Sequence, residues 1–373
     1  MIYADNAATS KLDSQALDAM MPYLKDVYGN PSQPYSFSRE SKAALRKSRE
    51  IIAKCINADP QEIYFTSGGT ESDNWALKGL CDNIGGRNTI VTSAIEHHAI
   101  LKTCDSLKNR GYKIQLLQPD SSGVISPSEL SSHLSKDVGI VSVMMANNEI
   151  GTIEPIKELA SMAHEYGAVF HTDAVQAMGH IKIDVKDLGV DLLSASAHKF
   201  NGPRGVGFLY VKKGTKLSPL HNGGSQESNM RAGTENIPGI VGMAIALNNN
   251  CELIQSSHQH LIQLENQLLS KLKTNVIDFK INGNRDFHLP GLVSLSFPNK
   301  EGEMILHRLD LKHICISTGS ACDAGREDIS HVLKAIKLEK TYAKGTIRIS
   351  LSKDNTDSEI DIICDELSSI IRS

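Results

Sequence analysis

The stretch that decides the fold is Glu62-Ile63-Tyr64-Phe65-Thr66-Ser67-Gly68-Gly69-Thr70-Glu71, which is followed by a helical pattern through Leu80. Its order predicts a strand, a glycine turn and a helix. Such a turn directs backbone N–H groups and the positive end of the helix dipole at an anion. A plain strand–helix connection, with Ser or Thr capping the helix, is about as consistent with this stretch. A Walker phosphate loop is excluded, because the GxxxxGK[ST] pattern is absent.

The region around this stretch, from about residue 60 to residue 211, alternates short apolar runs with helical patterns. This alternation is typical of parallel βαβ units, and Ile156–Tyr166 is one of the expected helices. The sequence therefore predicts an α/β fold with a mostly parallel sheet, whose ligand lies at the carboxyl ends of the strands. The expected strands are Glu62–Phe65, Thr89–Thr92, Lys113–Leu117, Gly139–Met145, Ala168–Thr172, Asp191–Ser194 and Gly207–Val211.

The pattern changes after Gly223. A long amphipathic stretch, roughly Ile240–Leu272, leads into a strand-rich region that includes Leu292–Phe297 and Ile347–Leu351. We expect a large domain over residues 15–255. A smaller C-terminal α/β domain is expected over residues 256–373, with residues 1–14 packed against it.

Composition excludes several classes of function. The 373 residues are 40% hydrophobic and 22% charged, and the net charge is −4, which favours neither nucleic-acid nor membrane-surface binding. No apolar run approaches the ~20 residues of a membrane span, and the N-terminus lacks a signal-peptide pattern, so we expect a cytoplasmic protein. Seven cysteines without a CxxC pair argue against a disulfide framework and a structural zinc site.

Two charged residues follow apolar strands. Ser194-Ala195-Ser196-Ala197-His198-Lys199 leaves a strand at a lysine, which could become a nucleophilic amine if it were desolvated. Asp173 ends another apolar strand, and a partly buried carboxylate there needs a cationic partner. The alternatives are a surface lysine in a turn and an aspartate that caps the next helix.

One cysteine has a distinctive setting. Cys322 lies in a small, polar, glycine-punctuated stretch, residues 317–328, which predicts a surface loop. A nucleophilic cysteine needs a thiolate, which nearby Arg326 or His97 could favour. The other cysteines are expected to be ordinary small apolar residues.

Eight segments, taken together and in order, resemble the aminotransferase class V group of pyridoxal phosphate (PLP) enzymes, and specifically the NifS/IscS-type cysteine desulfurases. The resemblance spans nearly the whole chain and implies PLP fold type I. The segments are Ala4–Thr9, Thr66–Ser72, Glu96-His97, Asn147–Gly151, Asp173–Gln176, Ser196–Lys199, Arg231–Asn236 and Ser320–Cys322.

This resemblance implies roles for individual residues. Lys199 would carry PLP covalently, Asp173 would pair with its pyridine nitrogen, and Gln176 would hydrogen-bond its ring hydroxyl. His97, rather than the adjacent His98, would stack on the ring and transfer protons. The remaining implied positions are Asn148 beside cofactor and substrate, Gly69, Thr70, Ser196 and His198 around the phosphate, Thr234 reaching in from the other subunit of a homodimer, and Arg348 on the substrate carboxylate.

The implied reaction converts L-cysteine to L-alanine. Its sulfur would pass to Cys322 as a persulfide and then to an acceptor protein such as an iron–sulfur scaffold. No metal site is implied, apart from Cys322 as a transient iron–sulfur ligand. The sequence departs from the family pattern at Tyr35, Ser38 and Ser352, which leaves the substrate entrance and the subgroup open.

Other functions remain open at this level. A selenocysteine lyase, a cystine lyase or an aminotransferase would use the same cofactor set, and an aminotransferase would not need Cys322. A PLP-binding scaffold that only docks sulfur-transfer partners would release no alanine. A cysteine hydrolase built on Cys322 and His97 would work without PLP. The acceptor pathway, whether iron–sulfur assembly, tRNA thiolation, thiamine or molybdenum cofactor synthesis or DNA sulfur modification, is not specified.

Overall fold

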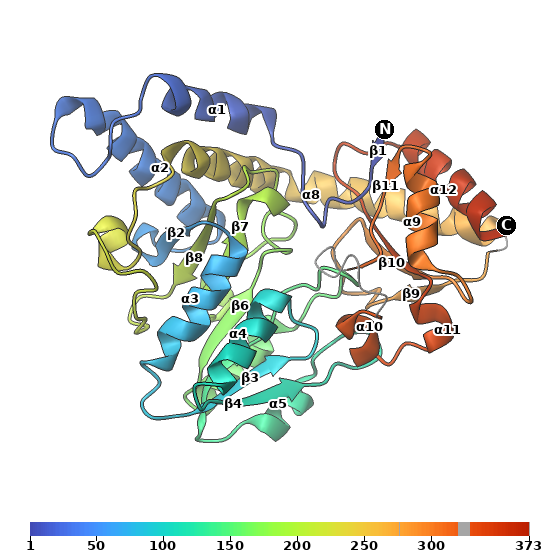
Figure 1. Cartoon of the computed structure of the whole chain (residues 1–373), viewed down its shortest axis with the longest axis horizontal. Coiled ribbons are helices and arrows are strands. Elements are labelled where there is room, and N and C mark those ends of the chain that lie inside the picture. The colour runs from blue at the N-terminus through green and yellow to red at the C-terminus, as the bar shows by residue number, and fades with distance from the viewer. Residues whose placement is uncertain (276, 320–328, 373) are drawn as a thin grey trace.

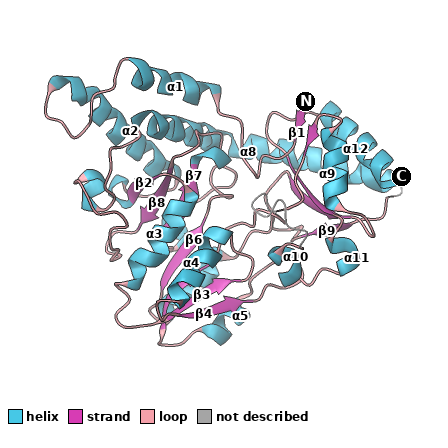
Figure 2. Ribbon diagram, in the orientation of Figure 1, coloured by secondary structure: helices cyan, strands magenta, loops and turns pink. Residues whose placement is uncertain are grey.

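A seven-stranded sheet forms the centre of the larger part of the molecule (Figure 1; Figure 2). The computed structural model of the chain describes residues 1–275, 277–319 and 329–372. Five neighbouring strands of this sheet run parallel, as the alternation of strands and helices predicted. In spatial order the strands are β2 (Ile63–Thr66), β8 (Gly207–Val211), β7 (Leu192–Ser196), β6 (Val169–Asp173), β5 (Val138–Ser142), β3 (Thr89–Ser93) and β4 (Lys113–Leu117).

The two strands at one edge of the sheet depart from the parallel pattern. Strand β8 runs antiparallel to both β7 and β2. A parallel crossover needs a dozen or more residues, and only residues 197–206 separate β7 from β8. The turn after Ser196 therefore returns the chain directly alongside β7, and Lys199 lies within this turn.

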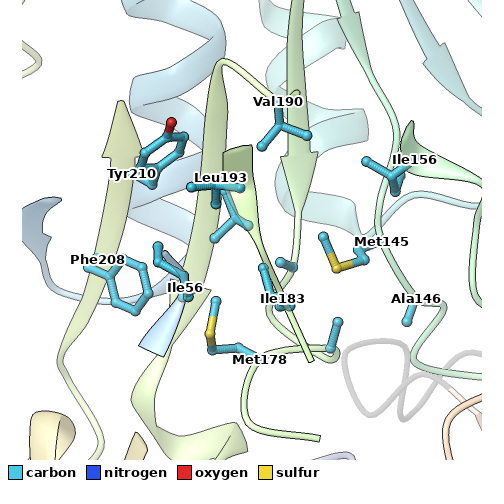
Figure 3. Packing of buried hydrophobic residues seen from close by; sticks show 14 of the residues in the cluster. Ile56, Met145, Ala146, Ile156, Met178, Ile183, Val190, Leu193, Phe208 and Tyr210 are labelled. Carbon is cyan, nitrogen blue, oxygen red and sulfur yellow. The ribbon is translucent and has the colours of Figure 1, made fainter. Parts of the chain in front are cut away.

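Helices cover both faces of the sheet and bury apolar side chains on each, and Figure 3 shows part of the larger cluster. Leu193, Phe208 and Tyr210 project from β7 and β8 onto Ile56 and Met178, and all five side chains are buried. The helices of this part are α1 (Ser14–Lys25), α2 (Arg39–Cys55), α3 (Gly69–Cys81), α4 (His98–Lys108), α5 (Pro127–His133), α6 (Ile156–Glu165) and α7 (Val185–Leu188).

Helix α8 (Ile237–Thr274) extends from the larger part of the molecule into the C-terminal part (Figure 1). The expected domain boundary at residue 255 lies inside this helix. Among the described residues, no helix is both long and apolar enough to span a bilayer. The C-terminal part contains β9 (Lys280–Asn282), β10 (Leu292–Ser296), β11 (Ile314–Cys315), β12 (Thr346–Ser350), α9 (Gly302–Asp310), α10 (His331–Ala335), α11 (Lys340–Ala343) and α12 (Asp357–Arg372).

The N-terminal residues pack on this C-terminal part. Strand β1 (Ile2–Tyr3) pairs in parallel with β11, and Asp5 forms an isolated bridge with Ser350 at the end of β12. Ile2 and Ala4 contribute to a second apolar core together with side chains of α8, α9 and α12. This pairing brings residues 5–9 to the carboxyl ends of the central strands, next to Lys199.

Candidate active site

A cavity of about 280 Å³ lies where the carboxyl ends of the central strands meet the N-terminal segment and β12. It brings together ten residues that the sequence singled out: Gly69, Thr70, His97, Asn148, Asp173, Gln176, Ser196, His198, Lys199 and Arg348. Thr234 is exposed and does not line the cavity of its own chain. Cys322 lies outside the described residues.

The turn between β2 and α3 forms one wall. Gly68 has a φ of +148°, which L side chains rarely adopt, and a Cβ at Gly69 would lie 2.6 Å from Cγ2 of Val175. Both positions therefore need glycine, and the first turn of α3 lies beside Ser196 at the cavity wall. This geometry favours the anion-binding interpretation of the turn.

Lys199 lies three residues beyond β7, in a 3-10 turn over Ala197–Lys199. Its Nζ donates hydrogen bonds to the carbonyl oxygens of Ala7 (2.6 Å) and Ala8 (2.8 Å). Gln176 Nε2 donates to the same Ala7 oxygen at 2.8 Å. The lysine is half-buried at the cavity wall, so it is not the surface lysine that the sequence alone allowed.

Two buried carboxyl groups lie together on the cavity floor. Asp173, at the end of β6, is 4% exposed and accepts the N–H of Val175 at 2.9 Å. Burial raises its pKa to about 6, although the Val175 N–H and the Lys199 ammonium act in the opposite direction. Asp73 of α3 lies beside it, and burial together with the Asp173 charge holds the Asp73 pKa well above its usual range. These carboxyl groups offer a strong site for a cationic ring nitrogen.

His97 ends the loop before α4 and caps that helix. Its Nδ1 accepts the N–H of Ala99 at 3.1 Å, so Nε2 carries the hydrogen of the neutral ring. Burial lowers the pKa of His97 to about 4, and the positive charge of Lys199 acts in the same direction. The ring is therefore neutral at physiological pH. His98 lines the cavity as well, because the chain turns into α4 at this point.

Arg348 reaches the cavity from β12 and is 1% exposed. Its Nη2 forms an ion pair with Asp5 Oδ1 at 2.8 Å, and Nη1 donates to the Asn148 carbonyl oxygen at 2.8 Å. Its Nε is buried and has no hydrogen-bond partner among the described residues. Asp5 and Asn148 therefore leave part of the hydrogen-bonding capacity of this guanidinium unused, and arginine is the side chain best suited to bind a carboxylate.

Several cavity residues had no assigned role in the sequence. Asp73 lies one helical turn after Gly69, so both face the same end of the sheet. Glu149, which lines the cavity, and Asp5, which pairs with the cavity residue Arg348, belong to segments that carried the family resemblance, but nothing local indicated their contacts. His331 has no sequence signal, because its position depends on how α10 packs near α4.

Comparisons with known proteins agree with this geometry. The aminotransferase class-V family model matches residues 2–363. Cysteine desulfurase IscS of Dictyoglomus turgidum is 46% identical over 99% of this chain and 94% of its own length. The Methanosarcina thermophila protein of the same name is 43% identical over 100% of this chain and 92% of its own.

Solved structures show the same relationship. A NifS-like protein superposes with a TM-score of 0.94 at 37% identity, covering 100% of this chain and 99% of its own. SspA in complex with cysteine gives a TM-score of 0.84 at 34% identity, over 95% of this chain and 100% of its own. The chain therefore belongs to the aminotransferase class-V family of PLP-dependent enzymes, and within it to the NifS/IscS-type cysteine desulfurases.

Proposed function

We propose that this enzyme converts L-cysteine to L-alanine and transfers the sulfur to Cys322 as a persulfide, from which an acceptor protein takes it. The observation that carries the proposal is the meeting of Lys199, Asp173 and Arg348 around one cavity. PLP and an amino acid can be held together by three groups of this kind. They are an amine and a buried carboxylate for the cofactor, and a guanidinium for the amino acid.

The residues present fit PLP. The backbone N–H groups at the start of α3, with Thr70, Ser196 and His198 nearby, suit its phosphate. Asp173, with Asp73 beside it, suits its ring nitrogen, since a buried carboxylate is stabilised by a compensating positive charge. Lys199 Nζ would hold its aldehyde carbon. When bound, PLP supplies an electron sink beside the α carbon of the substrate.

The remaining side chains bind and orient the substrate. The Arg348 guanidinium would hold the substrate carboxylate, while its contacts with Asp5 and Asn148 fix the plane of the group. His97 would stack on the cofactor ring and present its Nε2–H to the cavity. Asn148 lines the same cavity and would lie beside both the cofactor and the substrate.

The sulfur acceptor is proposed to be Cys322. A thiolate is a much stronger nucleophile toward sulfur than any hydroxyl group in the cavity. Attack forms an S–S bond as the substrate C–S bond breaks. The electron pair of the broken bond stays with the β carbon, which takes up a proton, and the carbon skeleton leaves as alanine. A protein such as an iron–sulfur scaffold would then take the sulfur.

We also propose a cytoplasmic homodimer. Thr234 is exposed in the segment that follows Arg231, which pairs with Glu71 beside the first turn of α3 at 2.8 Å. In a dimer, Thr234 would complete the phosphate site of the partner subunit. The large exposed side chains Tyr28, Tyr35 and Phe37 suit burial by a second copy.

A single-turnover experiment tests the function. Incubated with L-cysteine, the protein should form equal amounts of L-alanine and protein-bound sulfane sulfur. Lys199→Ala should lose both products, and borohydride should no longer fix PLP to the chain. Lys182→Ala, which changes an exposed lysine, is the control and should behave like the unaltered protein. Alanine formation by Lys199→Ala would contradict the proposal.

A further inference from the structure

An ion pair lies against the turn between β2 and α3, which forms the phosphate wall of the cavity. Arg231 Nε donates to Glu71 Oε1 at 2.8 Å, and Arg231 Nη2 donates to Glu71 Oε2 at 3.2 Å. The Arg231 side chain is 21% exposed and the Glu71 side chain 11%, so solvent and salt screen this pair less than a surface ion pair. Neither residue has a part in the chemistry proposed for the cavity.

The carboxylate of Glu71 also holds the turn itself. Its Oε2 accepts the backbone N–H of Ser67 at 3.1 Å and the hydroxyl group of the same serine. Ser67 directly precedes Gly68 and Gly69, and Gly69 lines the cavity. Glu71 is not among the described residues that line this cavity. Its carboxylate thus contacts the turn without lining the space that the cofactor would fill.

Glu71 places a negative charge close to an expected anion position. Burial acts to raise the pKa of Glu71, but hydrogen bonds from Arg231 and Ser67 outweigh it and hold the pKa below its ordinary value. Two residues span at most about 7 Å, so the ionised carboxylate on Ser67 lies within about 10 Å of the Gly69 N–H. A charge at this distance would repel a phosphate at the start of α3 unless a cation offset it.

Arg231 is the cation that offsets this charge. Within the described part of the chain, no other lysine or arginine forms an ion pair with Glu71. Glu227, whose charge also acts on Arg231, has a cation of its own, because Arg49 donates to both of its carboxylate oxygens. The guanidinium of Arg231 is therefore committed to Glu71.

We propose, building on the proposed PLP site, that Arg231 is a positioning residue for the cofactor phosphate, because it neutralises Glu71 and holds this carboxylate on Ser67. The first N–H groups of a helix have no partner within the helix, and they attract anions. Without Arg231, the Glu71 carboxylate is drawn to these N–H groups of its own helix and competes with the phosphate. Glu71 thus supports the phosphate site only while Arg231 neutralises it.

Cofactor titrations test this role. Full-length protein freed of PLP is titrated with PLP and with pyridoxal, which has the same ring and aldehyde but no phosphate, and binding is followed by absorption. Arg231→Gln should weaken PLP about tenfold, the effect of one unit charge at such a distance, and should change pyridoxal less than about twofold. Adding Glu71→Gln should restore PLP affinity to within about threefold, because a neutral amide oxygen still accepts from Ser67 and does not repel the phosphate.

Lys157→Gln is the matched control, because it removes an exposed ion pair of 2.6 Å with Asp187, and it should change neither affinity. An unchanged PLP affinity in Arg231→Gln, equal losses for PLP and pyridoxal, or no recovery in the double variant would overturn the proposal. Lack of recovery would show that Arg231 only supports the fold or acts through the nearby Thr234.

A further variant and the choice of readout keep the test decisive. If Arg231→Gln does not fold, Arg231→Met is titrated in its place with the same expected results. The titrations involve no turnover, so absence of alanine formation by the unaltered enzyme would count against the desulfurase function and not against Arg231.

Discussion

Replacing Arg348 by lysine keeps the positive charge and removes the planar fork. In the structure the guanidinium makes the Asp5 ion pair, donates to the Asn148 carbonyl and retains an unpaired buried N–H. A lysine ammonium is a point charge that cannot reproduce these three directions at once. Because Asp5 is largely buried, we expect lysine to keep the ion pair and to abandon the substrate carboxylate.

The magnitude follows from the lost contact. A hydrogen bond to a charged group contributes about 1.5–3 kcal/mol, which corresponds to roughly a 10- to 150-fold increase in KM for L-cysteine. Loss of the Asn148 contact should lower the free energy of unfolding by about 1 kcal/mol. The PLP absorption should stay unchanged, because Lys199, Asp173 and the start of α3 are untouched.

Steady-state kinetics and thermal unfolding of Arg348→Lys provide the measurement. Asp5→Asn is the comparison variant, since it breaks the ion pair that lysine is expected to keep and leaves the guanidinium in place. It should lose stability with a smaller change in KM. The substrate role of Arg348 would be refuted if Arg348→Lys lost stability but kept a KM within twofold of the unaltered enzyme. Such a result would show that Arg348 only supports the fold.

Three further predictions concern other parts of the enzyme. Cys322→Ser should retain PLP and bind L-cysteine but release almost no sulfur. In the unaltered enzyme, mass spectrometry after one turnover should place the added sulfur on the Cys322 peptide, and sulfur on Cys104 would contradict this. Thr234→Ala should leave a dimer in sedimentation experiments but weaken PLP retention several-fold, whereas a fully active monomer would refute the shared phosphate site. Burial raises the pKa of Glu96 to about 8, so its proton favours the folded state, and this contribution to stability is lost as pH rises from about 4.5 through 8. Glu96→Gln should therefore show a smaller fall in Tm than the unaltered protein between pH 5 and 8, and parallel Tm profiles would disprove the assignment.

Much of the fold and site could be predicted because the decisive signals are local. In three places an apolar strand leads directly to residues that line the cavity. The strands end before the first turn of α3, before Lys199 and at Asp173. Parallel strands then bring these ends to one edge of the sheet. The antiparallel β8 was not foreseen, although the ten residues after β7 are too few for a helical crossover.

Other features depend on contacts between distant segments. Nothing near Asp5 in the sequence indicates that it pairs with Arg348, 343 positions away. The contact between His331 Nε2 and the Glu96 carbonyl oxygen joins residues that are 235 positions apart. Local patterns carry no information about such pairs, since they are produced by the packing of α10 and β12 on the completed sheet.

The pairing of residues 2–5 with β11 and β12 also fixes the order in which the site can form. The Ala7 and Ala8 carbonyls that hold Lys199 reach it only when β1 has found Ile314 and Asp5 has found Ser350. Closing a loop of that length costs about 5 kcal/mol of chain entropy, which the apolar core around Ile2 and Ala4 offsets. During synthesis on the ribosome, Lys199 therefore emerges long before β11 and β12 can bring these two carbonyl groups to it.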